Sequence, residues 1–181
     1  MLVLVEPSGP INIGSIARLC KNFDVDELRI VNPRCDLNDP NALKMSVKGK
    51  NILQNAGIYS SLIDAIKDCN FVIATCGRLD HGEIPINSME EVFPLIQENS
   101  FETFAIVFGR EDRGLTNQEL GLCNLHVHIP TDPEYSSLNL AQAVQILVYE
   151  IRVSILKDQE YEEYWDVDLA TNEQTERLID H

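Results

Sequence analysis

Short apolar runs alternate along this chain with longer stretches of helical periodicity. The apolar runs predict buried strands at Leu2–Val5, Leu28–Val31, Phe71–Thr75, Phe104–Phe108 and Leu125–Ile129. Apolar residues at helical spacing predict helices at Ile16–Phe23, Leu62–Cys69, Met89–Gln97, Asn117–Leu122 and Leu138–Leu156. The strands are apolar throughout, as in a sheet whose two faces are both covered. The pattern therefore predicts an α/β fold with a mainly parallel sheet and helices on both faces.

Two of the expected helix starts carry a capping box. Ser88 is followed by Glu91, and Thr116 by Glu119. At this spacing each side chain satisfies a free backbone N–H of the other residue. The last expected helix ends near residue 157, so we expect one domain over residues 1–157. Residues 158–181 are expected to form an acidic tail or a short helix docked by Tyr161, Tyr164 and Trp165.

Composition narrows the setting of the protein. A chain of 181 residues suffices for one domain with a substantial core. Its five cysteines show no CxxC spacing, which argues against a disulfide framework or a zinc knuckle. No segment approaches the roughly 18 apolar residues of a membrane span. We therefore expect a cytoplasmic protein without a membrane segment or a bound metal.

Charge is distributed unevenly along the chain. The net charge of -15 argues against loose, nonspecific binding of nucleic acid. Residues 1–50 nevertheless carry seven Lys or Arg against six Asp or Glu, whereas residues 151–181 carry three against nine. A phosphate-binding face is expected in the first third of the chain. Most cations could also be ordinary solvated charges, and this interpretation is preferred for Arg29 and Lys67. The candidates there are Arg18, Lys21, Arg29, Arg34, Lys44, Lys48 and Lys50.

Polar and glycine-containing segments follow several of the expected strands. They are residues 9–18, 108–115 and 133–141, and a fourth strand end, Thr75-Cys76-Gly77, carries small residues. Ligands of parallel α/β sheets bind at the carboxyl ends of the strands. The cluster of hydroxyl and amide groups in residues 133–141 in particular indicates a loop that holds a polar ligand.

Several common chemistries are not supported by the motifs. The chain lacks GxGxxG after its first strand, the motif of dinucleotide-binding folds. It also lacks the phosphate-binding motif GxxxxGK[ST] and the serine-hydrolase motif GxSxG. His126 and His128 have no acidic or cysteine partner in pattern, so they are interpreted as histidines at a sheet end. Cys76 has no assignable base, so a buried or ligand-lining thiol is the preferred interpretation.

Three motifs in order carry a family resemblance. Asn12-x-Gly14-x-x-x-Arg18, Phe108-Gly-Arg-Glu111-x-x-Gly-Leu115 and Ile129-Pro leading to Ser137-Leu-Asn139 resemble the motifs of the SpoU-type RNA ribose 2′-O-methyltransferases of the SPOUT superfamily. The segment Pro-Glu-Tyr-Ser-Ser-Leu-Asn-Leu-Ala is most similar to the TrmJ-type branch. The resemblance covers about residues 1–155. It implies an α/β fold with a C-terminal trefoil knot that binds S-adenosyl-L-methionine in a bent shape.

The resemblance also implies which residues form the site. Cofactor-binding positions would be Thr75, Cys76, Gly77, Gly109, Ile129, Ser136, Ser137 and Leu138. Catalytic-motif positions would be Asn12, Arg18, Glu111, Ser137 and Asn139. We expect Arg18 to hold RNA phosphate and stabilise a developing alkoxide, because a guanidinium is not deprotonated in proteins. Glu111 is expected to orient Arg18 or Asn12, and Asn139 to brace the loops.

Structural alternatives exist for most of these positions. Asn12 and Gly14 are also typical turn formers, and Ser136 and Ser137 are typical helix caps. Asn139 fits a buried amide satisfied by backbone. These interpretations stay open at the level of sequence.

The activity implied by the resemblance is methyl transfer to a ribose 2′-hydroxyl of tRNA, at cytidine or uridine 32 of the anticodon loop. The alternatives are ribosomal RNA as substrate or a noncatalytic RNA-binding homologue. The family resemblance further implies a homodimer. The acidic balance leaves open an RNA-binding partner protein, because relatives of this branch carry a C-terminal extension, whereas only about 25 residues, acidic in their overall charge, follow the last motif helix here.

Overall fold

The computed structural model describes residues 1–77, 87–99 and 103–157. Its strands form one six-stranded sheet in the order β3-β2-β1-β5-β4-β6, and every pairing is parallel. The predicted parallel α/β sheet is therefore confirmed. The strand bounds are β1 Leu2–Val5, β2 Leu28–Val31, β3 Gly57–Tyr59, β4 Phe71–Thr75, β5 Phe104–Phe108 and β6 Leu125–Val127.

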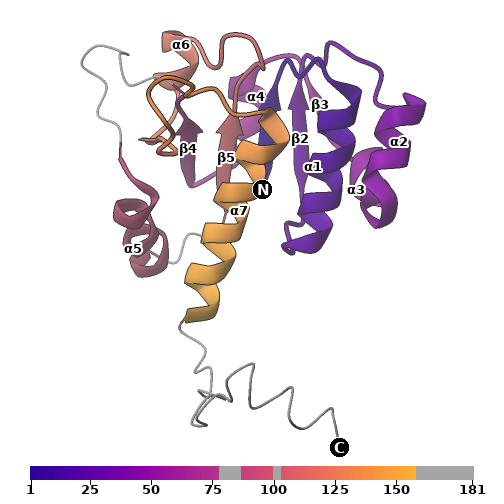
Figure 1. The fold of residues 1–181 in the computed structure, drawn as a ribbon. Helices are drawn as coiled ribbons and strands as arrows, with labels where there is room; N and C mark the ends of the chain where they lie inside the picture. The colour runs from indigo at the N-terminus through magenta and orange to yellow at the C-terminus, as the bar shows by residue number, and fades with distance from the viewer. Residues whose placement is uncertain (78–86, 100–102, 158–181) are drawn as a thin grey trace, which may run out of the picture.

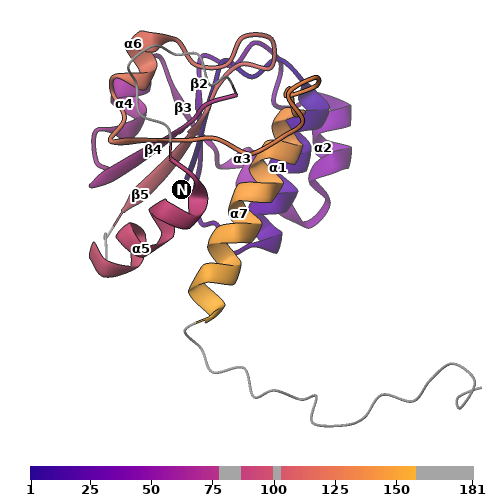
Figure 2. The same ribbon diagram turned by 60° about the vertical axis from the view of Figure 1, so that its left-hand side comes forward.

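Helices cover both faces of the sheet (Figures 1 and 2). One face carries α1, α5 and α7, with α2 and α3 beside α1, and the opposite face carries α4 and α6. The helix bounds are α1 Pro10–Asn22, α2 Pro40–Ser46, α3 Lys50–Gln54, α4 Leu62–Ile66, α5 Met89–Asn99, α6 Asn117–Leu120 and α7 Leu140–Lys157, with a 3-10 turn η1 Val47–Gly49. No helix within these described ranges has the length and apolarity that a membrane crossing requires.

The apolar strands separate two cores. Leu2, Leu4 and Phe108 project toward α1 and α7 and pack with Ile13 and Leu147. The alternate positions of the same strands, with Leu62 and Leu120 of the opposite layer, form the second core. Because both faces are buried, continuous apolar strands are the pattern that this architecture requires.

Several element bounds differ from the sequence-based expectations. Helix α1 begins at Pro10, six residues before the predicted start, so Asn12 and Gly14 are helical and Arg18 lies well inside the helix. Proline fits a first helical position because it lacks the N–H that would be unpaired there. Strand β6 ends at Val127 and α7 begins only at Leu140. β3, α2, η1 and α3 were not predicted.

Both capping boxes are present. The Thr116 hydroxyl accepts from the Glu119 backbone N–H, and the Glu119 side chain accepts from the Thr116 backbone N–H. Ser88 and Glu91 make the same reciprocal pair. The expected tail or docking helix over residues 158–181 lies outside the described residues.

Arg29 is a buried structural cation, so its interpretation as a solvated charge was wrong. Its side chain is 6% exposed and donates to Glu27 at 2.7 Å, to Asp68 at 2.5 Å and to the Ala65 carbonyl at 2.6 Å. The hydrogen bonds that Arg29 donates to Asp68 lower the pKa of that carboxyl to about 2. Asp68 lies 39 residues away in sequence, so the pair was not visible as a local pattern.

Gly14 brings α1 into backbone contact with α2. A Cβ built at Gly14 would lie 2.2 Å from the Ala42 carbonyl oxygen. Gly49 makes the equivalent approach from the other direction, with its Cβ position 2.2 Å from the Ala17 carbonyl oxygen. The glycine of the first motif is therefore required by helix packing, not by a turn.

We predict that Gly14→Ala destabilises the fold. Overpacking against backbone costs about 1–3 kcal/mol, whereas the better helix propensity of alanine returns only about 1 kcal/mol. Thermal unfolding followed by circular dichroism measures the difference. The matched control is Gly121→Ala, where the nearest atom to the new Cβ is 3.4 Å away. A Gly14→Ala protein as stable as the wild type would contradict the packing argument.

Candidate functional site

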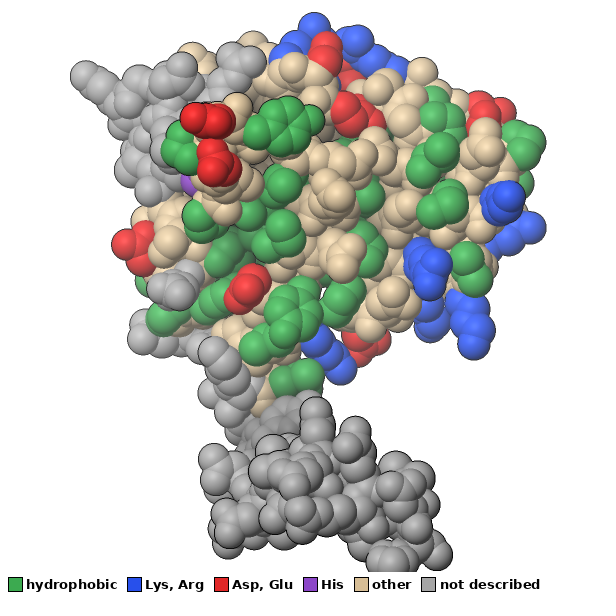
Figure 3. Space-filling model, viewed as in Figure 1, with side chains coloured by type: hydrophobic (Ala, Val, Ile, Leu, Met, Phe, Trp, Pro, Cys, Tyr) green, Lys and Arg blue, Asp and Glu red, His purple; other side chains and the backbone are tan. Residues whose placement is uncertain are grey.

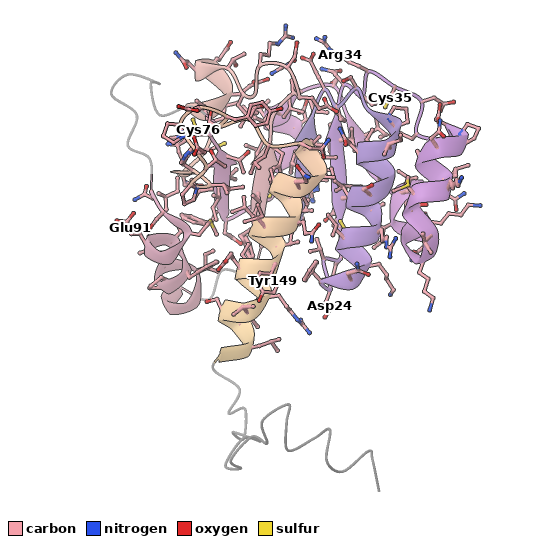
Figure 4. All side chains as sticks on the ribbon, viewed as in Figure 1. Asp24, Arg34, Cys35, Cys76, Glu91 and Tyr149 are labelled. Atoms are coloured by element: carbon pink, nitrogen blue, oxygen red, sulfur yellow. The ribbon has the colours of Figure 1, made fainter. Side chains whose placement is uncertain are left out.

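A pocket of about 340 Å³ opens at the carboxyl ends of β4, β5 and β6. Four segments that are far apart in sequence contribute to it, and Figure 4 shows Cys76 at this edge of the sheet. All eight residues that the resemblance assigns to the cofactor line this one pocket. They are Thr75, Cys76, Gly77, Gly109, Ile129, Ser136, Ser137 and Leu138.

The Thr75 side chain and the Cys76 backbone at the end of β4 already have structural partners. The Thr75 hydroxyl donates to the Val107 carbonyl at 3.0 Å. The Cys76 backbone N–H donates to the Val127 carbonyl at 2.8 Å, and Nδ1 of His128 lies 2.9 Å from the Cys76 carbonyl. These bonds hold the end of β4 against β5 and β6, so they fix the shape of this wall of the pocket.

His126 and His128 behave as sheet-end residues, as predicted. Nε2 of His126 lies 2.9 Å from the Leu120 carbonyl, which ties β6 to the end of α6. Within the described residues, no group of three or more His, Cys, Asp or Glu side chains is arranged to hold a metal ion.

The loop after β5 forms one wall of the pocket and is closed on itself. Arg110 and Gly114 exchange backbone hydrogen bonds of 2.9 and 3.3 Å, and Gly114 has a positive φ of 70° that favours glycine. Gly109 lies directly against this turn, since its Cβ position would be 2.3 Å from the Gly114 carbonyl carbon. The two glycines therefore allow a compact loop at the mouth of the pocket.

Arg110 fixes this loop to the rest of the sheet, and sequence reasoning missed it. Its guanidinium is 7% exposed, donates to both Glu119 oxygens at 2.9 Å and donates to Glu6 at 2.5 Å. The hydrogen bond from Arg110 is the main reason why the pKa of Glu6 falls to about 2. The only available signal was its position between Gly109 and Glu111 in the motif, because its partners are distant in sequence or belong to the capping box.

Glu111 closes the N-terminal end of α1. Its carboxylate accepts from the backbone N–H groups of Ser8 at 3.1 Å and Gly9 at 3.0 Å, and from Nδ2 of Asn12 at 3.2 Å. Burial raises the pKa of Glu111, but the hydrogen bonds to its carboxylate outweigh burial and hold the pKa below its usual value. The expectation that Glu111 orients Asn12 agrees with this geometry.

Asn139 extends this contact to the third motif. Its Nδ2 donates to Oδ1 of Asn12 at 2.9 Å, while its own Oδ1 accepts from the Ala141 backbone N–H at 2.9 Å. Asn139 therefore occupies the capping position of α7 that sequence analysis considered for Ser136 and Ser137. It is also exposed, so it is not the buried amide of the alternative interpretation. We call Glu111, Asn12 and Asn139 the three-motif clasp.

Arg18 stands apart from the pocket. It is exposed on α1, two turns beyond Asn12, and it is absent from the pocket lining. Within the described part of the chain its side chain has no hydrogen bond or ion pair. Glu111 therefore contacts Asn12 but not Arg18, which corrects the first of the two orienting roles considered for it.

We predict that Glu111→Gln weakens the fold in a pH-dependent way. Loss of a charged acceptor costs about 1–3 kcal/mol at neutral pH. Because the folded-state pKa is lowered, this stabilisation is present above the unfolded-state value of roughly 4.3 and disappears as the pH falls through the folded-state value. Urea unfolding at pH 7 and pH 3 measures it, with the exposed neighbour Asp112→Asn as control. An equal deficit of the Gln variant at both pH values would contradict the assignment.

Comparison with known proteins identifies a family that matches most of this chain. The model of the SpoU rRNA Methylase family matches residues 1–149. Over 156 residues the chain is 42% identical to the tRNA (cytidine/uridine-2'-O-)-methyltransferase TrmJ of Pectobacterium atrosepticum, covering 86% of this chain and 64% of that protein. The TrmJ protein of Photorhabdus laumondii is 38% identical over 183 residues, covering 99% of this chain and 76% of that protein.

A solved structure agrees with these relatives. The crystal structure of TrmJ from Z. mobilis ZM4 superimposes with a TM-score of 0.78 and 32% identity, covering 99% of this chain and 76% of that chain. The chain spans slightly less than two thirds of several curated relatives, at 62% to 64% of their lengths. The matched segment includes all three motifs, the pocket and the clasp, and the chain therefore belongs to the SpoU rRNA methylase family.

Proposed function

We propose that this protein is an S-adenosyl-L-methionine-dependent RNA methyltransferase that modifies a ribose 2′-hydroxyl of tRNA. One observation carries the proposal: the eight residues expected to hold the cofactor converge on a single pocket from separate segments of the chain. The names of the TrmJ relatives support tRNA as the substrate class. Position 32 of the anticodon loop rests on the motif resemblance, and ribosomal RNA is the alternative substrate.

The pocket suits this cofactor in size and in chemistry. Its volume of about 340 Å³ falls in the range of roughly 300–1,000 Å³ that small-molecule sites occupy. Gly77 and Gly109 expose backbone groups, Ile129 and Leu138 provide apolar surface for an adenine ring, and Ser137 adds a hydroxyl. When bound, S-adenosyl-L-methionine supplies an electrophilic methyl group.

The residues of this chain must then position the RNA and stabilise negative charge on the attacking oxygen. Arg18 is assigned both tasks, because it is an exposed guanidinium on the helix that the clasp anchors beside the pocket. The ribose proton leaves through phosphate or water. Asn12, Glu111 and Asn139 act by holding the three loops in register, and Ser137 faces the cofactor side of the same loop.

The proposal includes a knotted C-terminal half. Support comes from the hydrogen bonds that join the end of β4 to β6 and from the return of α7 onto α1. Family membership over residues 1–149 adds to this support. We assign residues 1–157 to the methyltransferase domain and 158–181 to an acidic tail or a short docking helix.

A homodimer would bring a second Arg18 to each pocket. Supporting this assembly, apolar side chains are exposed along α1 and α7, including Ile11 at 55%, Tyr149 at 53% and Ile155 at 47%. Figure 3 shows hydrophobic side chains gathered over α7. A cytoplasmic location and an RNA-binding partner protein remain predictions from the sequence.

Calorimetric titration with S-adenosyl-L-methionine tests the cofactor, and transfer of a tritiated methyl group to unmodified tRNA and to ribosomal RNA tests the reaction. We expect binding and transfer to tRNA, with ribose methylation located by mass spectrometry. Cofactor binding without transfer to either RNA would favour a noncatalytic homologue. No cofactor binding would overturn the proposal.

We predict that Arg18→Ala reduces methyl transfer at least 100-fold, because one charged group at a developing oxyanion contributes roughly that much. Cofactor affinity should change less than twofold, since Arg18 does not line the pocket. Single-turnover kinetics and calorimetry measure the two effects. The control is Lys67→Ala, an exposed cation at the end of α4. Normal turnover by Arg18→Ala would contradict the role.

We predict that two variants, each inactive alone, restore activity when one subunit of each is combined in the same dimer. Arg18→Ala lacks the guanidinium, and Leu138→Asp places a charge in the apolar part of the pocket. If Arg18 serves the partner's pocket, a mixed dimer keeps one pocket with both features intact. Co-expression with two affinity tags isolates that dimer, and about half of the wild-type activity is expected. Activity no higher than that of either parent would assign Arg18 to its own pocket.

A further inference from the structure

Most of the exposed cations without a hydrogen-bond or ion-pair partner in the described part of the chain lie on one helical layer. Arg29, Arg34, Arg110, Arg113 and Arg152 all make ion pairs. In contrast, exposed cations without a hydrogen bond or ion pair among the described residues occupy α1, α2, η1 and the start of α3. These are Arg18, Lys21, Lys44, Lys48 and Lys50, and we call them the basic layer. Lys67 is a comparable cation on the opposite face of the sheet.

Acidic residues are missing from the same segments. Of the 181 residues of the chain, 29 are Asp or Glu, so an even distribution would place several of them in the segments that form the basic layer. Residues 10–22 and 40–63 contain none. Ordinary solvated surfaces intersperse charges of both signs. In a protein with a net charge of -15, a one-sign layer is therefore a distinct feature of its surface.

Close helix packing holds these cations on one surface. The Cβ positions of Gly14 and Gly49 lie 2.2 Å from carbonyl oxygens of α2 and α1, respectively, so the helices meet with their backbones in contact. In Figure 3 several blue side chains lie at the right of the molecule, over α1 to α3, while other blue side chains lie at its top and near the lower part of α7. The layer begins at the site itself, because Asn12 of α1 belongs to the three-motif clasp.

We propose that the basic layer binds the phosphate backbone of the RNA substrate and guides it toward the pocket. This inference rests on the proposed function and extends it from Arg18 of the first motif to lysines outside the motifs. The lysine ammonium is a compact point charge, and it lacks the fork of donors with which arginine binds a single carboxylate. It is therefore suited to a series of phosphates along a nucleic-acid strand. Contacts of this kind position the nucleic acid and contribute affinity without reading its sequence.

The test is the salt dependence of tRNA binding by the triple variant Lys44→Gln, Lys48→Gln, Lys50→Gln. Each phosphate contact contributes about 0.7–0.9 to the slope of log affinity against log salt, so the slope should fall by about 2–3. Affinity at low salt should fall as well. Cofactor affinity and the transfer rate at saturating tRNA should equal those of the wild type, because these lysines do not line the pocket.

The control is Lys67→Gln, which removes an exposed cation from the other face and should leave the slope unchanged. Thermal unfolding of each variant checks the fold. If the triple variant unfolds, single variants at Lys44 and Lys48 replace it, and each should lower the salt slope by about 0.7–0.9. An unchanged slope would overturn the basic layer as an RNA surface and leave an acidic protein as its partner. Failure of the proposed function is distinguishable, because the wild type would then bind no cofactor or transfer no methyl group.

Discussion

The arrangement of the site depends on the Glu111 carboxylate at the N-terminal end of α1. A helix begins with unpaired N–H groups and a partial positive charge. Here a carboxylate from the β5–α6 loop, about 100 residues away, accepts from the backbone N–H groups of Ser8 and of Gly9, the cap residue of α1. The same carboxylate orients Asn12, which in turn accepts from Asn139 at the start of α7. One anion thus sets the relative positions of three loops and two helices.

Several polar side chains of the pocket are engaged in bonds that hold its walls together. Thr75 donates to Val107, His128 faces the Cys76 carbonyl, and Arg110 is held between Glu6 and Glu119. These interactions hold the strand ends and the Gly109–Leu115 loop in place. A ligand therefore meets a preformed surface, which lowers the entropy lost on binding.

Sequence reasoning recovered what depends on local pattern. Apolar strands and both capping boxes could be predicted because their signals lie within a few residues. β3 was missed because it is three residues long and its central Ile58 is exposed. The start of α1 was missed because Pro10, Asn12 and Gly14 resemble turn residues. The ordered motifs identified the pocket residues, but the clasp joins side chains 99 and 127 positions apart, which no spacing rule reveals.

The absence of acidic residues from α1 and residues 40–63 has a consequence before any contact forms. A molecule of net charge -15 that keeps acidic residues out of these segments carries its charge unevenly. An approaching polyanion is repelled in most orientations of the protein and attracted where the basic layer faces it. The encounter is therefore biased toward that orientation. Such steering acts on the association rate and weakens as ionic strength rises. An overall negative charge then favours selectivity, because polyanions held in other orientations dissociate quickly.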